Sequence, residues 1–291
     1  MPRFGVSVLL FGLLALPEVR AVNLRMEAAT TRIENITRAS APTDWKDANR
    51  HEALLSLGQH REWRTGLLAV GSVDFGAEDV THFNLLTATT QGLSGTLRWK
   101  FGFGAFAPWI AADAGLRYWS SRLDFDDGWT KTVALRAGKR FTSNLRVTAV
   151  ADWQQQDSSS AIFDLKHHRV FATVTWDITD RLQLSHGNGR LWGTFTANAS
   201  PGVWSRALAG ELGAALGAYY NTIPWAVTES YGRGWVTYRV DGHVSFWWLE
   251  LSPALGRNTS LPLRYESRLA VNLVGVKYRQ DLWSLALLHK F

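Results

Sequence analysis

The feature that most constrains this chain is an alternation of apolar and polar side chains that persists through segments of about ten residues. The stretch 145–153 shows it most clearly. One face carries Leu145, Val147, Ala149, Ala151 and Trp153, and the other carries Arg146, Thr148, Val150 and Asp152. A two-residue period is that of a β-strand, whose side chains point alternately to opposite faces. About ten residues is also the length that a tilted strand needs to cross a bilayer. The pattern therefore predicts a sheet with one face in lipid.

Strands with this alternation recur along the whole chain. We expect them at residues 24–34, 52–59, 65–75, 86–103, 109–119, 132–137, 145–153, 169–176, from 182 onward, and at 206–218, 235–240, 243–251, 265–276 and 283–291. The predicted fold class is all-β, a closed antiparallel transmembrane barrel of about fourteen strands, with twelve or sixteen as alternatives. Closure removes every free strand edge, which hydrocarbon requires. A soluble sandwich would alternate as well, but too many opposite-face positions are charged or small.

The connections between these strands differ in length. If both termini lie in the periplasm, an even strand number places the short turns 141–144 and 178–180 on the periplasmic side. The longer connections 120–128, 155–166 and 193–205 then fall outside, which is the pattern of outer-membrane barrels. The connection 220–232 does not fit, because this strand assignment makes it a long periplasmic segment.

Fifteen Trp residues are unusual for a chain of 291 residues. In a transmembrane barrel, aromatic side chains form girdles at the two membrane interfaces. We expect a periplasmic girdle of Trp109, Phe141, Trp176 and Phe291, and an external girdle of Trp119, Trp129 and Trp153.

The two ends of the chain point to export. Residues 1–21 read as a secretory signal peptide, with Arg3 before an apolar run and a small-residue pattern that ends at Ala21. Residues 22–291 would then form the barrel. The final strand, WSLALLHKF, resembles the C-terminal targeting strand of Gram-negative outer-membrane barrels, which typically ends in Phe; His289 departs from that pattern. The resemblance implies recognition by the barrel-assembly machinery, residence in the outer membrane, and lipids and lipopolysaccharide as neighbours.

The charged side chains of the polar faces would line the lumen. These inward positions are Arg98, Lys100, Asp113, Arg117, Arg136, Arg146, Asp152, Arg169, Glu211 and Arg239. Seven are basic and three acidic, which predicts a passive or accessory channel that favours small anionic solutes. Alternatively, the charges pair across neighbouring strands and fill the lumen. Fourteen strands lie between the small filled barrels and the open porins, so both pore and plug stay open.

The segment LSHGNGRLWG, residues 184–193, resembles the H-x-S-N-G segment of outer-membrane phospholipase A and the H-x-S-N of a lipid A deacylase. The resemblance implies a lipid esterase in which His186 activates a serine. However, Asn188 stands in place of that serine, and Ser185 falls on the opposite strand face unless a bulge at Gly187 or Gly189 re-aims it. Otherwise the segment is a glycine-rich strand that enters an external loop.

Other chemistries have little support. The chain has no Cys, and its His residues lack metal-ligand spacing, so we expect neither a metal nor a cofactor. The net charge of +6 is dispersed without a Lys/Arg run, which argues against nucleic acid as a partner. The segments IENITRAS and ELSPALGRNTSLPLRYES resemble parts of the barrel of surface lipoprotein assembly modifiers. A closed barrel for surface-protein export or adhesion is therefore the third functional alternative.

Overall fold

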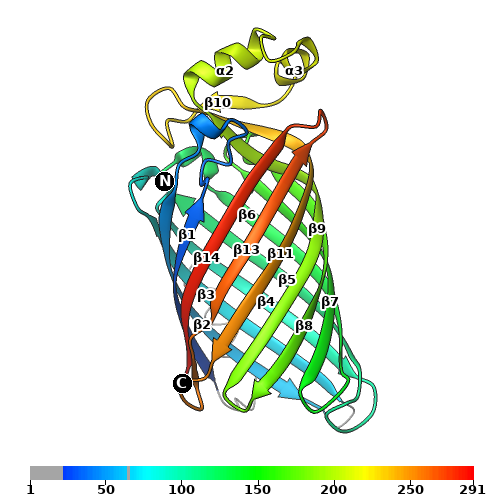
Figure 1. Cartoon of the computed structure of the whole chain (residues 1–291). Coiled ribbons are helices and arrows are strands. Elements are labelled where there is room, and N and C mark those ends of the chain that lie inside the picture. The colour runs from blue at the N-terminus through cyan, green and yellow to red at the C-terminus, as the bar shows by residue number, and fades with distance from the viewer. Residues whose placement is uncertain (1–21, 64–65) are drawn as a thin grey trace.

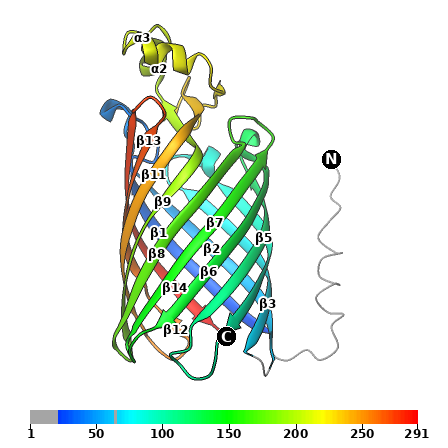
Figure 2. The same ribbon diagram turned by 90° about the vertical axis from the view of Figure 1, so that its right-hand side faces the viewer.

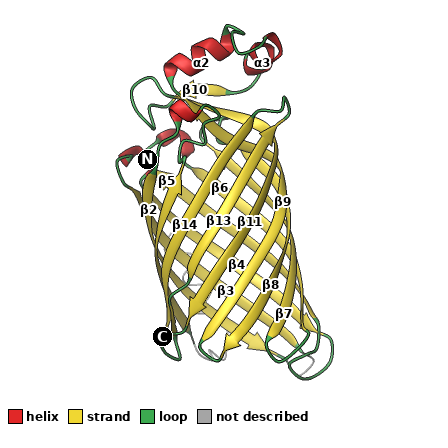
Figure 3. Cartoon of the chain, in the orientation of Figure 1, coloured by secondary structure: helices red, strands yellow, loops and turns green. Residues whose placement is uncertain are grey.

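The computed structural model describes residues 22–63 and 66–291, and these form a closed antiparallel barrel (Figures 1 and 3). Twelve strands make the wall. They are β1 (Asn23–Glu34), β2 (Ala48–Glu62), β3 (Leu67–Val80), β4 (Ala88–Lys100), β5 (Trp109–Ser121), β6 (Gly128–Arg140), β7 (Leu145–Ser158), β8 (Leu165–Thr179), β9 (Leu182–Ala199), β11 (Val236–Pro253), β13 (Leu263–Asn272) and β14 (Lys277–Lys290). Each wall strand pairs with its neighbour in the chain. The predicted fold class is confirmed.

The barrel closes where the first strand meets the last. β1 pairs with β14 in one continuous register, from Arg25 opposite Lys290 to Glu34 opposite Asp281. The backbone amide of Phe291 donates to the carbonyl of Leu24 at 3.0 Å, so the first strand and the C-terminus meet at one rim. No backbone edge of the wall is left unpaired along this seam, which is the condition for placing a sheet in hydrocarbon.

The two rims differ in part as predicted. At the rim that holds the C-terminus, the turns 141–144 and 180–181 are short, but the connections 101–108 and 254–262 are longer than 122–127 and 159–164 at the opposite rim, which were expected to be long. Residues 193–199, expected in a long connection, belong to β9. The opposite rim carries the long connections 35–47 and 200–235 (Figure 2). We call these the periplasmic and the external rim. The external connections also contain the one-turn helices η1 (Pro42–Asp44), η2 (Asn84–Leu86) and η3 (Asp124–Asp126).

Two predicted strands are wrong. Residues 206–218 are not part of the wall; α2 (Pro201–Leu208) and α3 (Ala214–Tyr220) occupy this stretch, because Pro201 opens the first helix and the stretch is rich in the helix formers Ala and Leu. Residues 235–240 and 243–251 are one strand, β11, which runs through Gly242. Two short strands, β10 (Trp225–Val227) and β12 (Thr259–Ser260), lie outside the wall and bring the total to fourteen.

This correction also changes the side on which residues 220–232 lie. The segment 220–232 is part of a single external insertion between β9 and β11, and not a periplasmic connection. Its helices stand above the external rim (Figure 2). Trp204 of α2 stacks on Tyr238 of β11 with ring centroids 4.8 Å apart, and Tyr220 of α3 packs beside both. In residues 22–63 and 66–291, no helix has the length and apolarity of a membrane span.

Side chains of the wall alternate between lumen and lipid. On β6, Val133 and Leu135 point outward and are 51% and 64% exposed, while Thr132 and Arg136 point inward. Five of the residues predicted as girdles lie on the outer surface or at its periplasmic rim: Trp129, Phe141, Trp153, Trp176 and Phe291.

Trp109 and Trp119 do not belong to the girdles. Both lie an even number of residues from Asp113 on β5, so the two-residue period turns them into the lumen with it. A Cβ atom added to Gly138 would overlap the ring of Trp109, and Trp119 lines an internal cavity. Their assignment to the lipid face was wrong because aromatic character was given more weight than strand phase.

Candidate functional site: the lumen and its external vestibule

The middle of the lumen is lined by small side chains. The inward residues of β4 are Thr90, Gly92, Ser94 and Thr96, and those of β6 include Thr130, Thr132 and Ala134. All of these residues are partly exposed, although they face the interior of the barrel. In a small barrel filled by side chains such positions would be buried. The central lumen is therefore accessible to solvent.

Two of the predicted lumen acids pair with arginines. Arg136 donates twice to Asp113, from Nε to Oδ2 at 2.6 Å and from Nη2 to Oδ1 at 2.5 Å. Arg169 donates from Nε to Asp152 Oδ2 at 2.9 Å. The charge of each acid is thus balanced by an arginine of a neighbouring strand, as the filled-lumen alternative anticipated. The pairing also fixes the arginines against the wall.

The remaining predicted lumen bases have no acidic partner among the described residues. They are Arg98, Lys100, Arg117 and Arg146. Arg98, Lys100 and Arg146 line one cavity of about 180 Å³ near the periplasmic rim, together with Trp109. This side of the lumen carries an excess of positive charge.

Two predicted lumen residues lie elsewhere. Glu211 is exposed in the turn between α2 and α3, outside the barrel. Arg239 lies on the external end of β11, and its guanidinium donates to the carbonyls of Ala161 and Asp164 in the β7–β8 loop. Glu211 was misplaced because the wall alternation was extended into the external insertion, where strand phase does not decide what a side chain faces. Arg239 lies on a wall strand, but at its external end, where the side chain bonds to a loop.

The β1–β2 loop, residues 35–47, folds across the external mouth. Asn35 shapes it: its side-chain carbonyl accepts from the amide of Ala39 at 3.0 Å and from the hydroxyl of Thr37 at 2.8 Å. Both Asn35 and Arg38 adopt the left-handed conformation, with φ of 57° and 49°. The segment IENITRAS, residues 33–40, covers the end of β1 and the first part of this loop.

The β1–β2 loop is also bonded to β9. In the wall, β9 is separated from β1 by three strands, β11, β13 and β14. Asn198 donates to the carbonyl of Thr37 at 2.7 Å, and Arg38 donates to the hydroxyl of Thr196 at 3.3 Å. The amide of Ser200 donates to Asp44 at 2.7 Å. These bonds join the β1–β2 loop to the external end of β9 across the mouth, and we call this connection the chord.

A second set of contacts locks the β9–β11 insertion onto the same loop. Tyr231 donates from its hydroxyl to the carbonyl of Ile36 at 3.0 Å, and burial raises the pKa of Tyr231 to about 12. Lys46 donates to the carbonyl of Tyr231 at 2.6 Å, with its ammonium 4.7 Å from the ring centroid of Trp235. The external connections thus form a small packed unit of their own.

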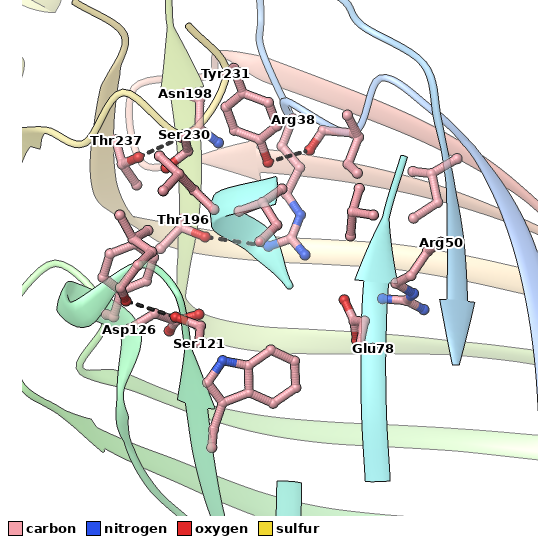
Figure 4. Close-up of a pocket in the computed structure, with 18 of the residues that line it drawn as sticks. Arg38, Arg50, Glu78, Ser121, Asp126, Thr196, Asn198, Ser230, Tyr231 and Thr237 are labelled. Atoms are coloured by element: carbon pink, nitrogen blue, oxygen red, sulfur yellow. Dashed lines mark hydrogen bonds between the residues drawn. The ribbon is translucent and has the colours of Figure 1, made fainter. Parts of the chain in front are cut away.

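Beneath this unit lie two adjoining cavities of about 400 and 450 Å³, which we call the vestibule (Figure 4 shows the first). Arg38 and Arg268 line both cavities. The first cavity also holds Arg50 and the acidic residues Glu52, Glu78 and Asp126. The second holds Arg169, Arg264 and Glu266 beside Phe171, Phe246 and Trp248. The first cavity therefore holds as many acidic groups as guanidinium groups, whereas guanidinium groups are in excess in the second.

Asp126 belongs to η3, outside the wall. Burial raises the pKa of Asp126 to about 6, although Gln156 donates to its Oδ1 at 3.0 Å. Burial therefore makes the carboxylate of Asp126 less favourable relative to its protonated form than in water.

The segment 184–193 does not assemble a catalytic dyad. Ser185 is buried on the lumen side, where its hydroxyl donates to Thr175 at 3.3 Å, whereas His186 is exposed on the lipid side beside Trp247. The pairing of β9 with β11 has no bulge at Gly187 or Gly189. The condition for bringing serine and base together is therefore not met.

The glycines of this segment have a packing role instead. A Cβ at Gly187 would overlap the ring of Trp248, and one at Gly189 would overlap Phe171 and lie 2.8 Å from Phe246. Because glycine has no side chain, the rings of Trp248, Phe171 and Phe246 can pack against the inner face of the wall here.

No family model matches this chain, and no curated protein matches it either. Among solved structures, it is similar to an outer membrane channel from Pseudomonas putida F1, with a TM-score of 0.59 and 11% identity over 95% of this chain and 97% of that one. It is also similar to the KdgM porin in complex with disordered oligogalacturonate, with a TM-score of 0.47 and 9% identity over 92% of this chain and 99% of that one. The NanC porin gives a TM-score of 0.45 and 9% identity, with coverage of 93% and 100%.

Only the first likeness is close enough to bear on the fold. The chain has the fold of a Gram-negative outer-membrane β-barrel. The identities are too low to carry an activity or a substrate from these proteins to this one.

Sequence reasoning missed most of the vestibule. Arg38 lies in a loop, for which alternation predicts no direction. Arg264, Glu266 and Arg268 lie at every second residue of β13 and share one face, so the alternation could have found them. In the described part of the chain, no group of three His, Asp or Glu side chains could hold a metal ion.

Proposed function

We propose that this protein is an outer-membrane channel with a water-filled lumen that favours small anions. The observation that carries the proposal is the lining of the central lumen, where small inward residues are partly exposed and arginine and lysine outnumber the unpaired acids. The predicted signal peptide, residues 1–21, lies outside the described residues. The C-terminal strand closes the barrel against β1, which suits a strand recognised during assembly.

We infer that the narrowest part of the path lies at the vestibule. The β1–β2 loop crosses the mouth there and directs Arg38 into both cavities. A solute that enters from outside must pass this guanidinium. We therefore expect the vestibule to set the selectivity and the wall to set the maximal current.

Conductance in a planar bilayer tests the proposal. The purified full-length barrel should give stepwise currents, with a reversal potential in a KCl gradient that indicates preference for chloride. Arg136→Glu or Arg169→Glu should lower this preference or reverse it, because each puts a carboxylate beside Asp113 or Asp152. Arg206→Glu, on α2 outside the lumen, is the matched control and should behave as the original protein. A folded barrel that passes no current would overturn the channel.

One observation favours a second candidate, a closed barrel for surface-protein export or adhesion. The external connections pack on one another through Tyr231, Lys46 and Trp235, as a binding platform would. This candidate predicts no current, together with loss of a surface partner when the insertion 200–235 is shortened.

A further inference from the structure

The arginines of the vestibule outnumber the carboxylates that could neutralise them. Glu266 lies between Arg264 and Arg268, bonded to both; its Oε1 accepts from Arg268 Nε at 2.5 Å. Arg38 lines the same cavity, and the only hydrogen bond of its guanidinium among the described residues goes to the hydroxyl of Thr196. Arg264 and Arg268 thus share one carboxylate, while Arg38 has no ion-pair partner in the described part of the chain.

These guanidinium groups are held in place before any ligand arrives. Arg264 lies over the ring of Trp248, 4.6 Å from its centroid, and Arg169 lies 4.9 Å from the ring centroid of Phe171. Arg38 is fixed by its left-handed backbone and by the bond from Asn198 to Thr37. Donors that are already ordered lose little conformational entropy upon binding.

The rest of the second cavity is mainly apolar. Leu165, Leu191, Val244 and Phe246 line it, and its volume of about 450 Å³ is in the range of small-molecule sites. In the first cavity, the acids Glu52, Glu78 and Asp126 are matched by as many arginines, so this cavity offers an anion no excess of positive charge. A ligand for the second cavity should therefore combine an anionic group with an apolar body.

We propose that the second cavity of the vestibule binds an organic carboxylate with an apolar body, and that Arg38 and Arg268 receive its carboxylate. Guanidinium groups suit this role because they donate parallel hydrogen bonds to both carboxylate oxygens. The proposal rests on the proposed function, since it names the kind of solute that would enter the channel. Its site is nevertheless measurable in a barrel that does not conduct.

Binding to the detergent-solubilised full-length protein tests the site. The probes are phenylacetate, its neutral analogue phenylacetamide, and acetate, which has the charge without the ring; inorganic phosphate is the fourth. Phenylacetate should bind saturably in isothermal titration calorimetry, and the other three at least about tenfold more weakly, because each lacks the carboxylate or the apolar body. Equal binding of phenylacetamide, or of phosphate, would overturn the proposal.

Variants assign the site to its residues. Arg38→Gln and Arg268→Gln should each weaken phenylacetate binding by about tenfold or more, since each removes a charged donor. Arg268→Lys should keep more of the affinity than Arg268→Gln, because lysine keeps the positive charge. This comparison distinguishes an effect of lost charge from an effect of lost packing. Arg206→Gln on α2 should bind like the original protein. Unchanged affinity in both glutamine variants would refute the assignment.

The outcomes for site and channel are distinguishable. A barrel that conducts chloride but whose current phenylacetate does not block in a saturable way would refute the site and leave the channel standing. Saturable binding in detergent without any current would refute the channel and leave the site standing.

Discussion

The wall of the barrel and its external end are built on different principles. In the wall, each side chain faces lumen or lipid according to its position in a strand, and the hydrogen bonds run between neighbouring backbones. At the external end, side chains bond to the backbones of segments distant in the chain, as Asn198 does to Thr37 and Tyr231 to Ile36. If the protein is the channel proposed above, the wall would supply a regular passage, and the external end would supply the selectivity that depends on individual groups.

The comparison predicts that the wall tolerates added volume only where no ring lies against it. Gly187→Ala places a methyl group in the ring of Trp248 and should destabilise the barrel by about 1–3 kcal/mol, the usual cost of overpacking. Gly71→Ala is the matched control, because nothing lies within 4 Å of its added Cβ. The measurement is equilibrium unfolding in urea with reconstituted protein. Equal stability of the two variants would show that the aromatic rings are free to move aside.

The external end should alter current without altering the wall. Replacement of residues 36–46 by a short glycine linker removes the chord between the β1–β2 loop and β9, together with Arg38. We expect a several-fold larger single-channel conductance and a weaker preference for chloride, while the thermal unfolding of the strands changes little. If the variant had the same conductance as the protein with the full-length loop, the narrowest point of the path would lie elsewhere.

The smallest effect we predict concerns pH. The folded pKa of Asp126 is about 6, above its ordinary value of 3.8, so the folded loops bind this proton more tightly than the unfolded chain does. The resulting stabilisation is complete below the ordinary value and is lost as the pH rises through about 6. Hydrogen exchange of residues 122–127, corrected for its intrinsic pH dependence, should therefore quicken across this window.

Asp126→Asn should abolish that dependence, because the amide does not titrate. Asp124→Asn, in the same one-turn helix, should leave it in place. A pH dependence that survives in Asp126→Asn would assign the titration to another group.

Sequence reasoning succeeded where a regular period decides the outcome. It found the closed sheet, the short turn 141–144, and the inward direction of Asp113, Arg136 and Arg169, because a two-residue period fixes direction once a strand is recognised. It failed at 206–218, where an alternation occurs by chance in a stretch rich in helix formers. It failed at Trp109 and Trp119 because the preference of tryptophan for membrane interfaces was given more weight than the strand alternation, which turns both residues into the lumen.

The sequence by itself determined that this chain is a barrel with an apolar outside, since alternation, strand length and terminal segments are all local properties of the chain. The tertiary structure alone decided that Arg38 faces Arg268, that Tyr231 binds Ile36, and that Trp248 lies over Gly187. The physical reason is that strand phase is set by neighbouring residues, whereas the positions of loops depend on hydrogen bonds and packing between segments that lie about two hundred residues or more apart.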